Sequence, residues 1–192
     1  TVITTTGDGS GGIMTTGGGI TNATNLTVTT SGRSSAAIRT DRGGGTVNID
    51  GGTYTSNGLG SPAIYSTAAI TVSNATLVSN LSEGVCIEGM NTITLTDCDL
   101  TANNTQCNGN ATFLDTIMIY QSMSGDADSG TSAFTMTGGS ITGNNAGTGG
   151  GVYVGQKCSF TMDGGTITGN TATASNGGGI YIHRSEEHTS EL

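Results

Sequence analysis

Hydrophobic residues alternate with Thr, Ser and other polar residues in short runs, and these runs recur along the chain. Five segments align without gaps: VNIDGGTYTSN (47–57), ITVSNATLVSN (70–80), ITLTDCDLTAN (93–103), FTMTGGSITGN (134–144) and FTMDGGTITGN (160–170). Each holds two alternating runs, a corner of small or turn-forming residues between them, and a closing Asn. A period of two is typical of β-strands with one buried face, so each segment predicts two short strands.

A further apolar strand is expected between successive segments. It is found in SSAAIRT, SPAIYST, EGVCIEG, DTIMIYQ, GGGVYVG and GGGIYIH. The alternation predicts one column of inward residues formed by Ile38, Ile64, Ile87, Ile119, Val154 and Ile182, with Ile13 as an earlier member. Gly, Asn and Asp, which suit tight turns, lie between the strands. Each repeat therefore predicts three strands joined by tight corners.

Such a repeat cannot bury its apolar side chains alone, but coils stacked at ~4.8 Å share a narrow apolar interior. The sequence therefore predicts an all-β solenoid, a parallel β-helix of about seven coils of roughly 23–26 residues, with loop insertions. The closing Asn of each segment predicts a ladder of stacked amides at one corner. The alternative is that Asn only suits the turn. These ladder residues are Asn57, Asn80, Asn103, Asn144 and Asn170.

Composition agrees with a thin-cored solenoid and excludes other classes of protein. The chain has 192 residues with 34 Gly, one Pro and only 33% hydrophobic residues, which rules out a bundle of long helices. No apolar run approaches the ~18 residues of a membrane span, so no membrane insertion is expected. The net charge of −9 argues against nucleic acid as a partner, because phosphate binding needs Lys and Arg.

The two ends of the chain suggest a piece of a longer protein. The chain begins at Thr1 and lacks the basic region and apolar stretch of a signal peptide. We therefore expect residues 1–183 to be a single β-helix fragment truncated at both ends. The segment RSEEHTSEL (184–192) resembles a translated sequencing adapter, so we expect it to be a non-native tail. The alternative is a natural acidic tail.

The repeats resemble a known group of proteins. The phrases GGTITGNTA and GGGIYI resemble right-handed parallel β-helix repeats of bacterial secreted and surface proteins, of the adhesin-like and polymorphic-outer-membrane-like kinds. The stretch from SAAIRTDRGGG to SPAIYST, with MIYQSMSGDA, is similar to secreted β-helices described as carbohydrate-binding. This resemblance implies an extracellular or bacterial cell-surface location and a non-catalytic role as adhesin-like stalk or glycan-binding surface. It implies no particular functional residue.

One outward sheet face is the candidate ligand-binding site. The alternation points four of the five Tyr outward on the face of the further strand. A Tyr ring stacks on a sugar and its hydroxyl forms hydrogen bonds, so glycans or host-surface components are the expected partners. Charged residues on this face could anchor a polar or acidic sugar; the alternative is that Tyr is simply a good strand residue. The predicted glycan face comprises Arg39, Tyr65, Glu88, Tyr120, Tyr153 and Tyr181.

Other readings of the outward residues are less favoured. A polysaccharide lyase or glycoside hydrolase needs clustered acids, and the nearest candidates are Asp97 with Asp99 and Asp126 with Asp128. Asp97 occupies a turn slot, and no catalytic constellation is visible. Asp126 and Asp128 form a partial Ca²⁺ loop, so structural Ca²⁺ is the one cofactor considered.

Threonine pairs suggest a minor alternative, an ice-binding solenoid. The pairs Thr53/Thr55 and Thr166/Thr168 fit a flat hydroxyl array, but Thr76/Val78, Asp99/Thr101 and Ser140/Thr142 interrupt it. Thr is also favoured in strands for ordinary reasons.

The four cysteines and the open ends complete the expectations. The spacing of Cys86, Cys98, Cys107 and Cys158 fits no zinc motif; a Cys98–Cys107 disulfide is conceivable, and free thiols are favoured. End coils without polar caps predict end-to-end self-association.

Overall fold

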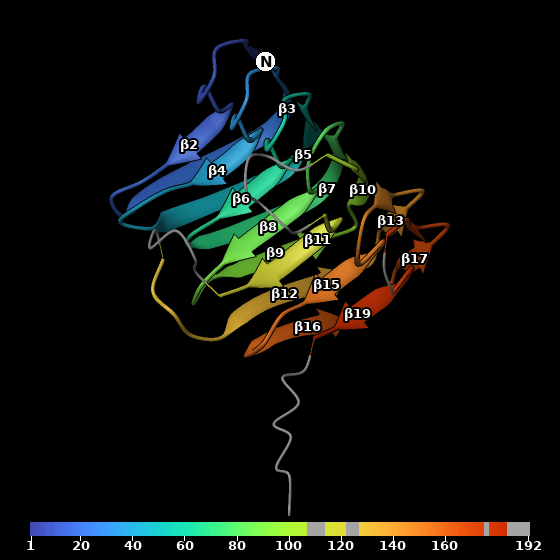
Figure 1. Cartoon of the computed structure of the whole chain (residues 1–192). Helices are drawn as coiled ribbons and strands as arrows, with labels where there is room; N and C mark the ends of the chain where they lie inside the picture. The colour runs from blue at the N-terminus through green and yellow to red at the C-terminus, as the bar shows by residue number, and fades with distance from the viewer. Residues whose placement is uncertain (107–113, 122–126, 175–176, 184–192) are drawn as a thin grey trace, which may run out of the picture.

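In the computed structural model, residues 1–106, 114–121, 127–174 and 177–183 are described, and their regular structure consists of parallel β-strands (Figure 1). The candidate residues Cys107 and Asp126 and the segment 184–192 lie outside the described residues. One sheet has seven strands, each the further strand of a repeat. They are β2 (Ile13–Thr15), β4 (Ile38–Thr40), β6 (Ile64–Ser66), β8 (Val85–Glu88), β11 (Ile117–Tyr120), β15 (Val152–Val154) and β19 (Ile180–Ile182).

The other sheet network has twelve strands and carries the aligned segments. Its first strands are β1 (Val2–Thr5), β3 (Gly19–Thr30), β5 (Gly45–Ser56), β7 (Ala69–Ser79), β9 (Thr92–Thr96) and β10 (Asp99–Asn104). The rest are β12 (Ser132–Thr137), β13 (Ser140–Thr142), β14 (Asn145–Ala146), β16 (Cys158–Met162), β17 (Thr166–Thr168) and β18 (Thr171–Ala172). In β3, β5 and β7 the two predicted strands of a segment form one long bent strand, because hydrogen bonding continues through the corner.

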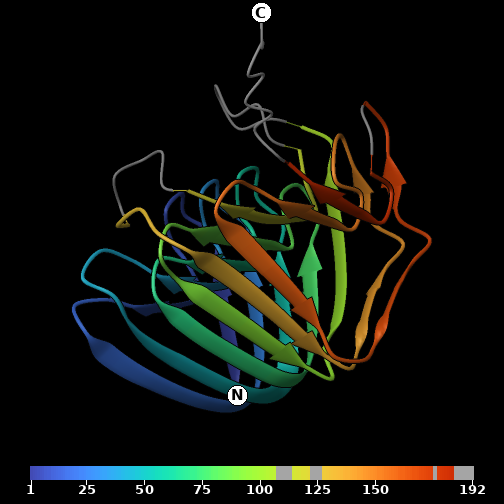
Figure 2. The ribbon, with the colours of Figure 1, turned by 90° about the horizontal axis from the view of Figure 1, so that it is seen from below.

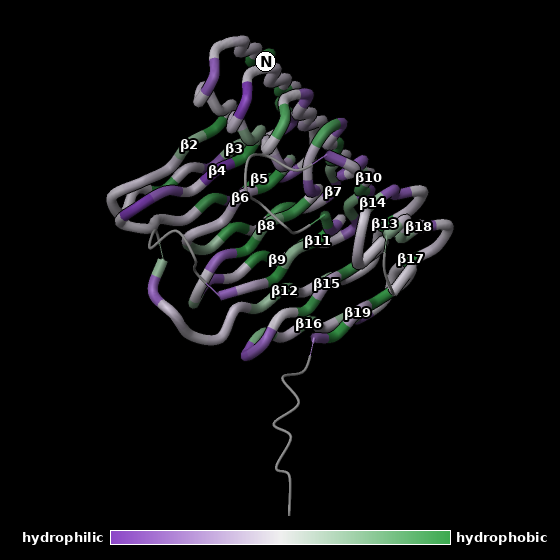
Figure 3. Tube along the Cα trace, in the orientation of Figure 1, coloured by the Kyte–Doolittle hydropathy of each residue, from purple (hydrophilic) through white to green (hydrophobic). Residues whose placement is uncertain are grey.

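The coils stack in register around one apolar interior. Seen from below, they superimpose, with both sheets facing the same interior (Figure 2). Hydrophobic residues recur on the strands of successive coils (Figure 3), and a single cluster of buried side chains runs from Ile13 to Val154. The rings of Phe134 and Phe160 stack at 5.4 Å on neighbouring coils. The predicted all-β parallel β-helix is confirmed, and no described helix is long and apolar enough to span a membrane.

The corner inside each segment requires a left-handed backbone. One position, repeated coil after coil, has a positive φ and is always Gly, Asn or Asp, the residue types that tolerate this conformation. Its members are Asn25, Gly51, Asn74, Asp97, Gly138 and Gly164, with φ of 51°, 70°, 54°, 50°, 76° and 97°. This left-handed corner sets the bend between the two strands. This geometry explains the Gly, Asn or Asp of the repeat and gives Asp97 a conformational role.

The closing Asn side chains form hydrogen bonds between coils. The Asn80 amide donates to Asn57 Oδ1 at 2.7 Å, and the Asn144 amide donates to Asn170 Oδ1 at 2.6 Å. Asn103 instead donates to the backbone oxygen of Asn80 at 3.3 Å. Amide-to-amide contacts therefore hold two coil pairs, and an amide-to-backbone contact joins a third.

The column of inward residues in the seven-stranded sheet differs from the predicted one. Ile38 pairs with Ile64 as expected, but Ile64 then pairs with Val85, and Ile87 pairs with Ser66. The predicted alignment was wrong by two residues at this one step, whereas Ile87, Ile119, Val154 and Ile182 pair with one another as predicted. A shift of two keeps Ile87 inward, so the alternation cannot detect it.

Replacing Asp97 by Ala should lower the free energy of unfolding by about 1 kcal/mol relative to Asp97→Gly, because a Cβ without a local polar partner disfavours positive φ. Urea unfolding of the two variants measures this difference. Asp99→Asn, two residues away on an exposed strand position and still an acceptor for Ser140 Oγ, is the control and should change stability by less than about 0.5 kcal/mol. Equal stability of Asp97→Ala and Asp97→Gly would contradict the conformational role.

Candidate functional site

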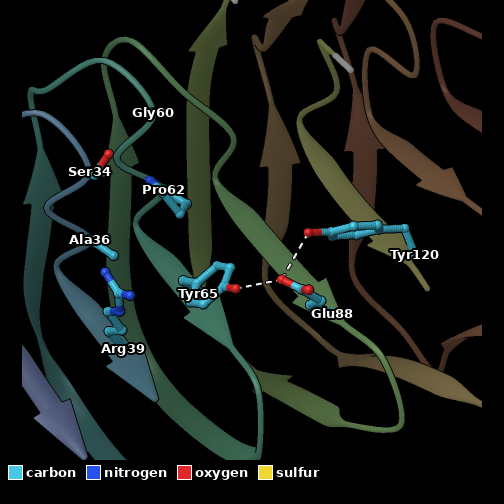
Figure 4. A pocket seen from close by; sticks show the side chains of 8 residues that line it. All are labelled: Ser34, Ala36, Arg39, Gly60, Pro62, Tyr65, Glu88 and Tyr120. Atoms are coloured by element: carbon cyan, nitrogen blue, oxygen red, sulfur yellow. Dashed lines mark hydrogen bonds between the residues drawn. The ribbon is translucent and has the colours of Figure 1, made fainter. Parts of the chain in front are cut away.

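The outer face of the seven-stranded sheet brings four predicted site residues together (Figure 4). Arg39 of β4 and Tyr65 of β6 are direct cross-strand partners. The guanidinium carbon of Arg39 lies 5.3 Å from the centroid of the Tyr65 ring, a cation–π geometry. Arg39 Nη2 also forms an ion pair with Asp41 Oδ2 at 2.7 Å. The cation is therefore held by an aromatic ring and a carboxylate at once.

Glu88 connects the two tyrosines of this group. Its Oε2 accepts hydrogen bonds from the Tyr65 hydroxyl at 2.5 Å and from the Tyr120 hydroxyl at 3.0 Å. Tyr120 is the direct cross-strand partner of Glu88, whereas Tyr65 reaches it diagonally from the strand on the other side. Glu88 is only 1% exposed, although its strand position points outward. The expected exposed carboxylate is thus buried between phenols.

A hollow of about 390 Å³ adjoins this network. Its volume falls at the lower end of the range of small-ligand sites. The side chains of Arg39, Tyr65, Glu88 and Tyr120 line one part, and the corner loops before β4 and β6 line the rest with Ser34, Ala36, Gly60 and Pro62. The sequence analysis missed these loop residues, because alternation identifies faces of strands and does not place corners beside them.

Burial keeps the Tyr120 phenol at the hollow and the nearby Cys86 thiol in their protonated forms. Burial, followed by neighbouring negative groups that include Glu88, raises the pKa of Tyr120, so its hydroxyl remains a donor. Burial also raises the pKa of the Cys86 thiol, and Glu83 and Glu88 raise it further. A protonated, buried thiol is a poor nucleophile, so Cys86 acts as packing in the sheet face.

Two predicted members of the glycan face lie away from the hollow. Tyr153 and Tyr181 pair on β15 and β19, with ring centroids 5.7 Å apart. The Tyr153 hydroxyl forms a hydrogen bond with His183 Nδ1 at 3.2 Å, and Tyr153 is only 8% exposed. Because of the two-residue register shift, both tyrosines share a column with Arg39 and Tyr65, whereas Glu88 and Tyr120 occupy the next column. The structure thus places Tyr153 and Tyr181 outside the lining of the hollow, although both belong to the outer-face cluster of Cys86, Met118 and Tyr153 against which Tyr65 and Tyr120 also pack.

A buried carboxyl that the sequence analysis missed lies at the corner before β11. Asp115 is 0% exposed, and neither of its carboxyl oxygens has a hydrogen-bond partner within the described residues. Burial, assisted by the charge of Glu83, raises the pKa of Asp115 to about 8. Asp115 is therefore a neutral acid at pH 7. Asp115 is the first residue of the DTIMIYQ repeat strand, but the alternation does not reveal whether a residue at this corner is buried.

The remaining candidate residues do not form a group suited to a metal ion in the described ranges. Asp97 forms the left-handed corner, and Asp99 accepts a hydrogen bond from Ser140 Oγ at 2.5 Å. Asp128 is exposed, and its proposed Ca²⁺ partner Asp126 is not described. Residues 1–106, 114–121, 127–174 and 177–183 contain no group of three side chains suited to a metal ion. The described cysteines Cys86, Cys98 and Cys158 are free thiols.

The threonine pairs lie in register on the twelve-stranded sheet. Thr53 pairs with Thr76, and Thr55 pairs with Val78. On the next strand, Asp99 pairs with Thr76. Val78 and Asp99 therefore interrupt the two columns on adjacent coils, and the hydroxyl array is not continuous along the solenoid.

The comparisons with known proteins identify no relative of this chain. The chain matches no protein-family model, no curated protein sequence and no solved structure. The β-helix is thus shown by the structure itself, and the resemblance to bacterial surface proteins rests on the repeat sequences alone.

Asp115→Asn should stabilise the protein at neutral pH. A carboxyl with a raised folded-state pKa takes up a proton on folding, so its effect is absent below about pH 4 and destabilises increasingly as the pH rises toward 8. The amide removes this penalty, by up to about 4 kcal/mol at pH 7, while keeping the shape of the side chain. Urea unfolding of both proteins from pH 4 to pH 8 measures the difference. Parallel stability curves would show that Asp115 does not take up a proton on folding.

Proposed function

We propose that this protein is a non-catalytic, extracellular β-helix of a bacterial cell surface that binds carbohydrate at the hollow beside Tyr65 and Tyr120. The observation that carries the proposal is the convergence of two phenols, a carboxylate and a guanidinium on one hollow of the outer sheet face. Carbohydrate sites combine aromatic rings with a few oriented polar groups in this way. The same solenoid of stacked coils supports a role as an adhesin-like stalk.

The polar groups at the hollow are held in place before a ligand arrives. The short contacts of Glu88 with the two hydroxyls fix all three side chains, so little conformational entropy is lost on binding. The hollow thus offers an aromatic surface beside polar groups that their mutual contacts hold in place.

The presence of a single carboxylate in the lining of the hollow favours a binding role over hydrolysis. Glycoside hydrolysis ordinarily needs a pair of carboxyl groups on either side of the scissile bond. Among the residues that line the hollow there is one, Glu88, and two phenols occupy one of its oxygens. The lyase or hydrolase alternative has no comparable support. The location at a bacterial surface is supported by the resemblance of the repeats to secreted β-helices.

Tyr65→Phe combined with Tyr120→Phe should weaken glycan binding at least about tenfold, because each loses a charge-assisted hydrogen bond that orients Glu88. A glycan array followed by calorimetry on the best-binding glycan measures the loss. Tyr181→Phe, which does not line the hollow, is the matched control and should bind like the wild type. An unchanged array pattern for the double variant would refute the hollow as the binding site.

We also propose end-to-end association of this chain. Apolar side chains are exposed on the two end coils, with Ile20 71%, Ile180 47% and Ile182 65% exposed. Unpaired parallel edges carrying such residues are templates for further strands.

Sedimentation velocity at rising concentration should therefore show oligomers of this chain. Ile182→Lys combined with Ile20→Lys should restore the monomer, because charges on an edge oppose strand pairing. A wild-type protein that stays monomeric throughout would contradict the association.

A further inference from the structure

We infer that the corner formed by Asp115 and Glu83 is a binding site for a divalent cation, with Ca²⁺ as the ion that its oxygen atoms suit. This cation site is independent of the proposed carbohydrate site at the hollow. It follows from two acidic residues on neighbouring coils, from a buried carboxyl without a partner, and from the bare glycine backbone beside that carboxyl.

The two acidic residues occupy the same corner of neighbouring coils. Strand β8 pairs with β11 in parallel, and just before these strands the N–H of Gly84 donates to the carbonyl oxygen of Thr116 at 2.7 Å. Glu83 and Asp115 are the preceding residues of the two coils, and the charge of Glu83 acts on Asp115. Two ionised carboxylates in this position repel each other, and a cation bound between them would remove the repulsion.

The Asp115 side chain is the feature that points to a ligand. It is fully buried, and neither of its carboxyl oxygens has a hydrogen-bond partner within the described residues. Its Oδ1 lies 2.9 Å from the point that a Cβ on Gly149 would occupy, so glycine backbone takes the place of a side chain beside the carboxyl. A buried carboxyl without a partner is unfavourable, and a bound cation would supply the missing partner.

The residues around Glu83 hold the two acids at this corner. The Glu83 carboxyl accepts hydrogen bonds from the side chains of Ser82 and Asn104. The Asn104 amide also donates to the backbone oxygen of Asp115 at 2.9 Å. Glu83 is only half-buried, whereas Asp115 is fully buried. An ion and its waters would therefore reach the corner from the side of Glu83.

The chemistry of these groups favours Ca²⁺. This ion takes about six to eight oxygen ligands in flexible geometry, from carboxylates, amide and backbone carbonyls, and water. Mg²⁺ demands a near-ideal octahedron and gives up its waters reluctantly, which a buried acid between two coils suits poorly. The corner has two carboxyl groups, fewer than the groups of three that the described ranges lack, so backbone oxygens and water would complete the shell. Two carboxylates predict a dissociation constant on the order of 10⁻⁴–10⁻³ M, as in extracellular modules.

Terbium luminescence tests the site, because Tb³⁺ replaces Ca²⁺ at oxygen ligands and is excited through a nearby tyrosine. The Cβ of Tyr153 lies 2.9 Å from the same point beside Gly149 that Asp115 Oδ1 approaches. Tb³⁺ bound at Asp115 should therefore emit on tyrosine excitation, and Ca²⁺ should displace it. Mg²⁺ should displace it at least about tenfold less effectively.

Four variants assign the binding to this corner. Asp115→Asn and Glu83→Gln should each weaken Ca²⁺ binding at least about tenfold, because each removes one charged ligand. Asp128→Asn, at an exposed acid elsewhere, changes the net charge equally and should bind like the wild type. Tyr153→Phe should dim the Tb³⁺ emission and leave the stabilisation by Ca²⁺ unchanged.

Thermal unfolding gives a second readout and verifies that each variant is folded. Saturating Ca²⁺ should raise the Tm of the wild type by about 3 °C or more, because an ion that binds only the folded protein stabilises it. Asp115→Asn and Glu83→Gln should lose this shift. In EDTA, Asp115→Asn should be at least as stable as the wild type, so that its loss of the shift cannot come from unfolding.

The other outcomes overturn the site. A wild type that Ca²⁺ neither stabilises nor relieves of Tb³⁺ has no such site, and wild-type binding by Asp115→Asn places the ion elsewhere. An equal loss in Asp128→Asn reduces the binding to general attraction by an acidic chain. Equal stabilisation by Mg²⁺ overturns the assignment of Ca²⁺. If Asp115→Asn is less stable than the wild type in EDTA, Glu83→Gln decides between these outcomes.

Discussion

Parallel hydrogen bonding from coil to coil is the constraint on which the rest of the structure depends. Each coil buries too few apolar residues to be stable alone, so it must present its strands in register to the coils above and below. That register requires every coil to turn at the same place. The left-handed corner at positions such as Asn74, Asp97 and Gly138 meets this requirement with three residue types that share one conformation.

The same constraint creates the candidate site. In a parallel sheet, side chains on adjacent strands lie side by side whatever their separation in sequence, so Tyr65, Glu88 and Tyr120 meet from three successive coils. Their spacing is fixed by the backbone ladder and by the hydrogen bonds to Glu88. A rigid solenoid thus supplies a preorganised group of phenols and a carboxylate without a dedicated binding domain.

The site also shows why an outward position need not be an exposed one. Glu88 points away from the apolar interior, yet the large rings of Tyr65 and Tyr120 cover it. Cys86, Met118 and Tyr153 form a second, smaller buried cluster on the same outer face. The sheet is therefore packed on both sides over part of its length. Burial on the outer side accounts for the raised pKa values of the Cys86 thiol and the Tyr120 phenol.

The period-two alternation and the recurring corner residues were enough to determine the parallel β-helix and which residues face inward or outward, because these properties depend on local backbone geometry. Arg39, Tyr65, Glu88 and Tyr120 could accordingly be placed on one face. The Arg39–Tyr65 and Glu88–Tyr120 pairs follow the predicted alignment, but the pairs between β6 and β8 do not, since a shift of two residues there leaves every face unchanged. Only the packed structure decided that Glu88 lies between two phenols, that Arg39 is held by Asp41, and that Asp115 is buried without a partner. These features depend on corner lengths and on side chains from different coils, which no single repeat contains.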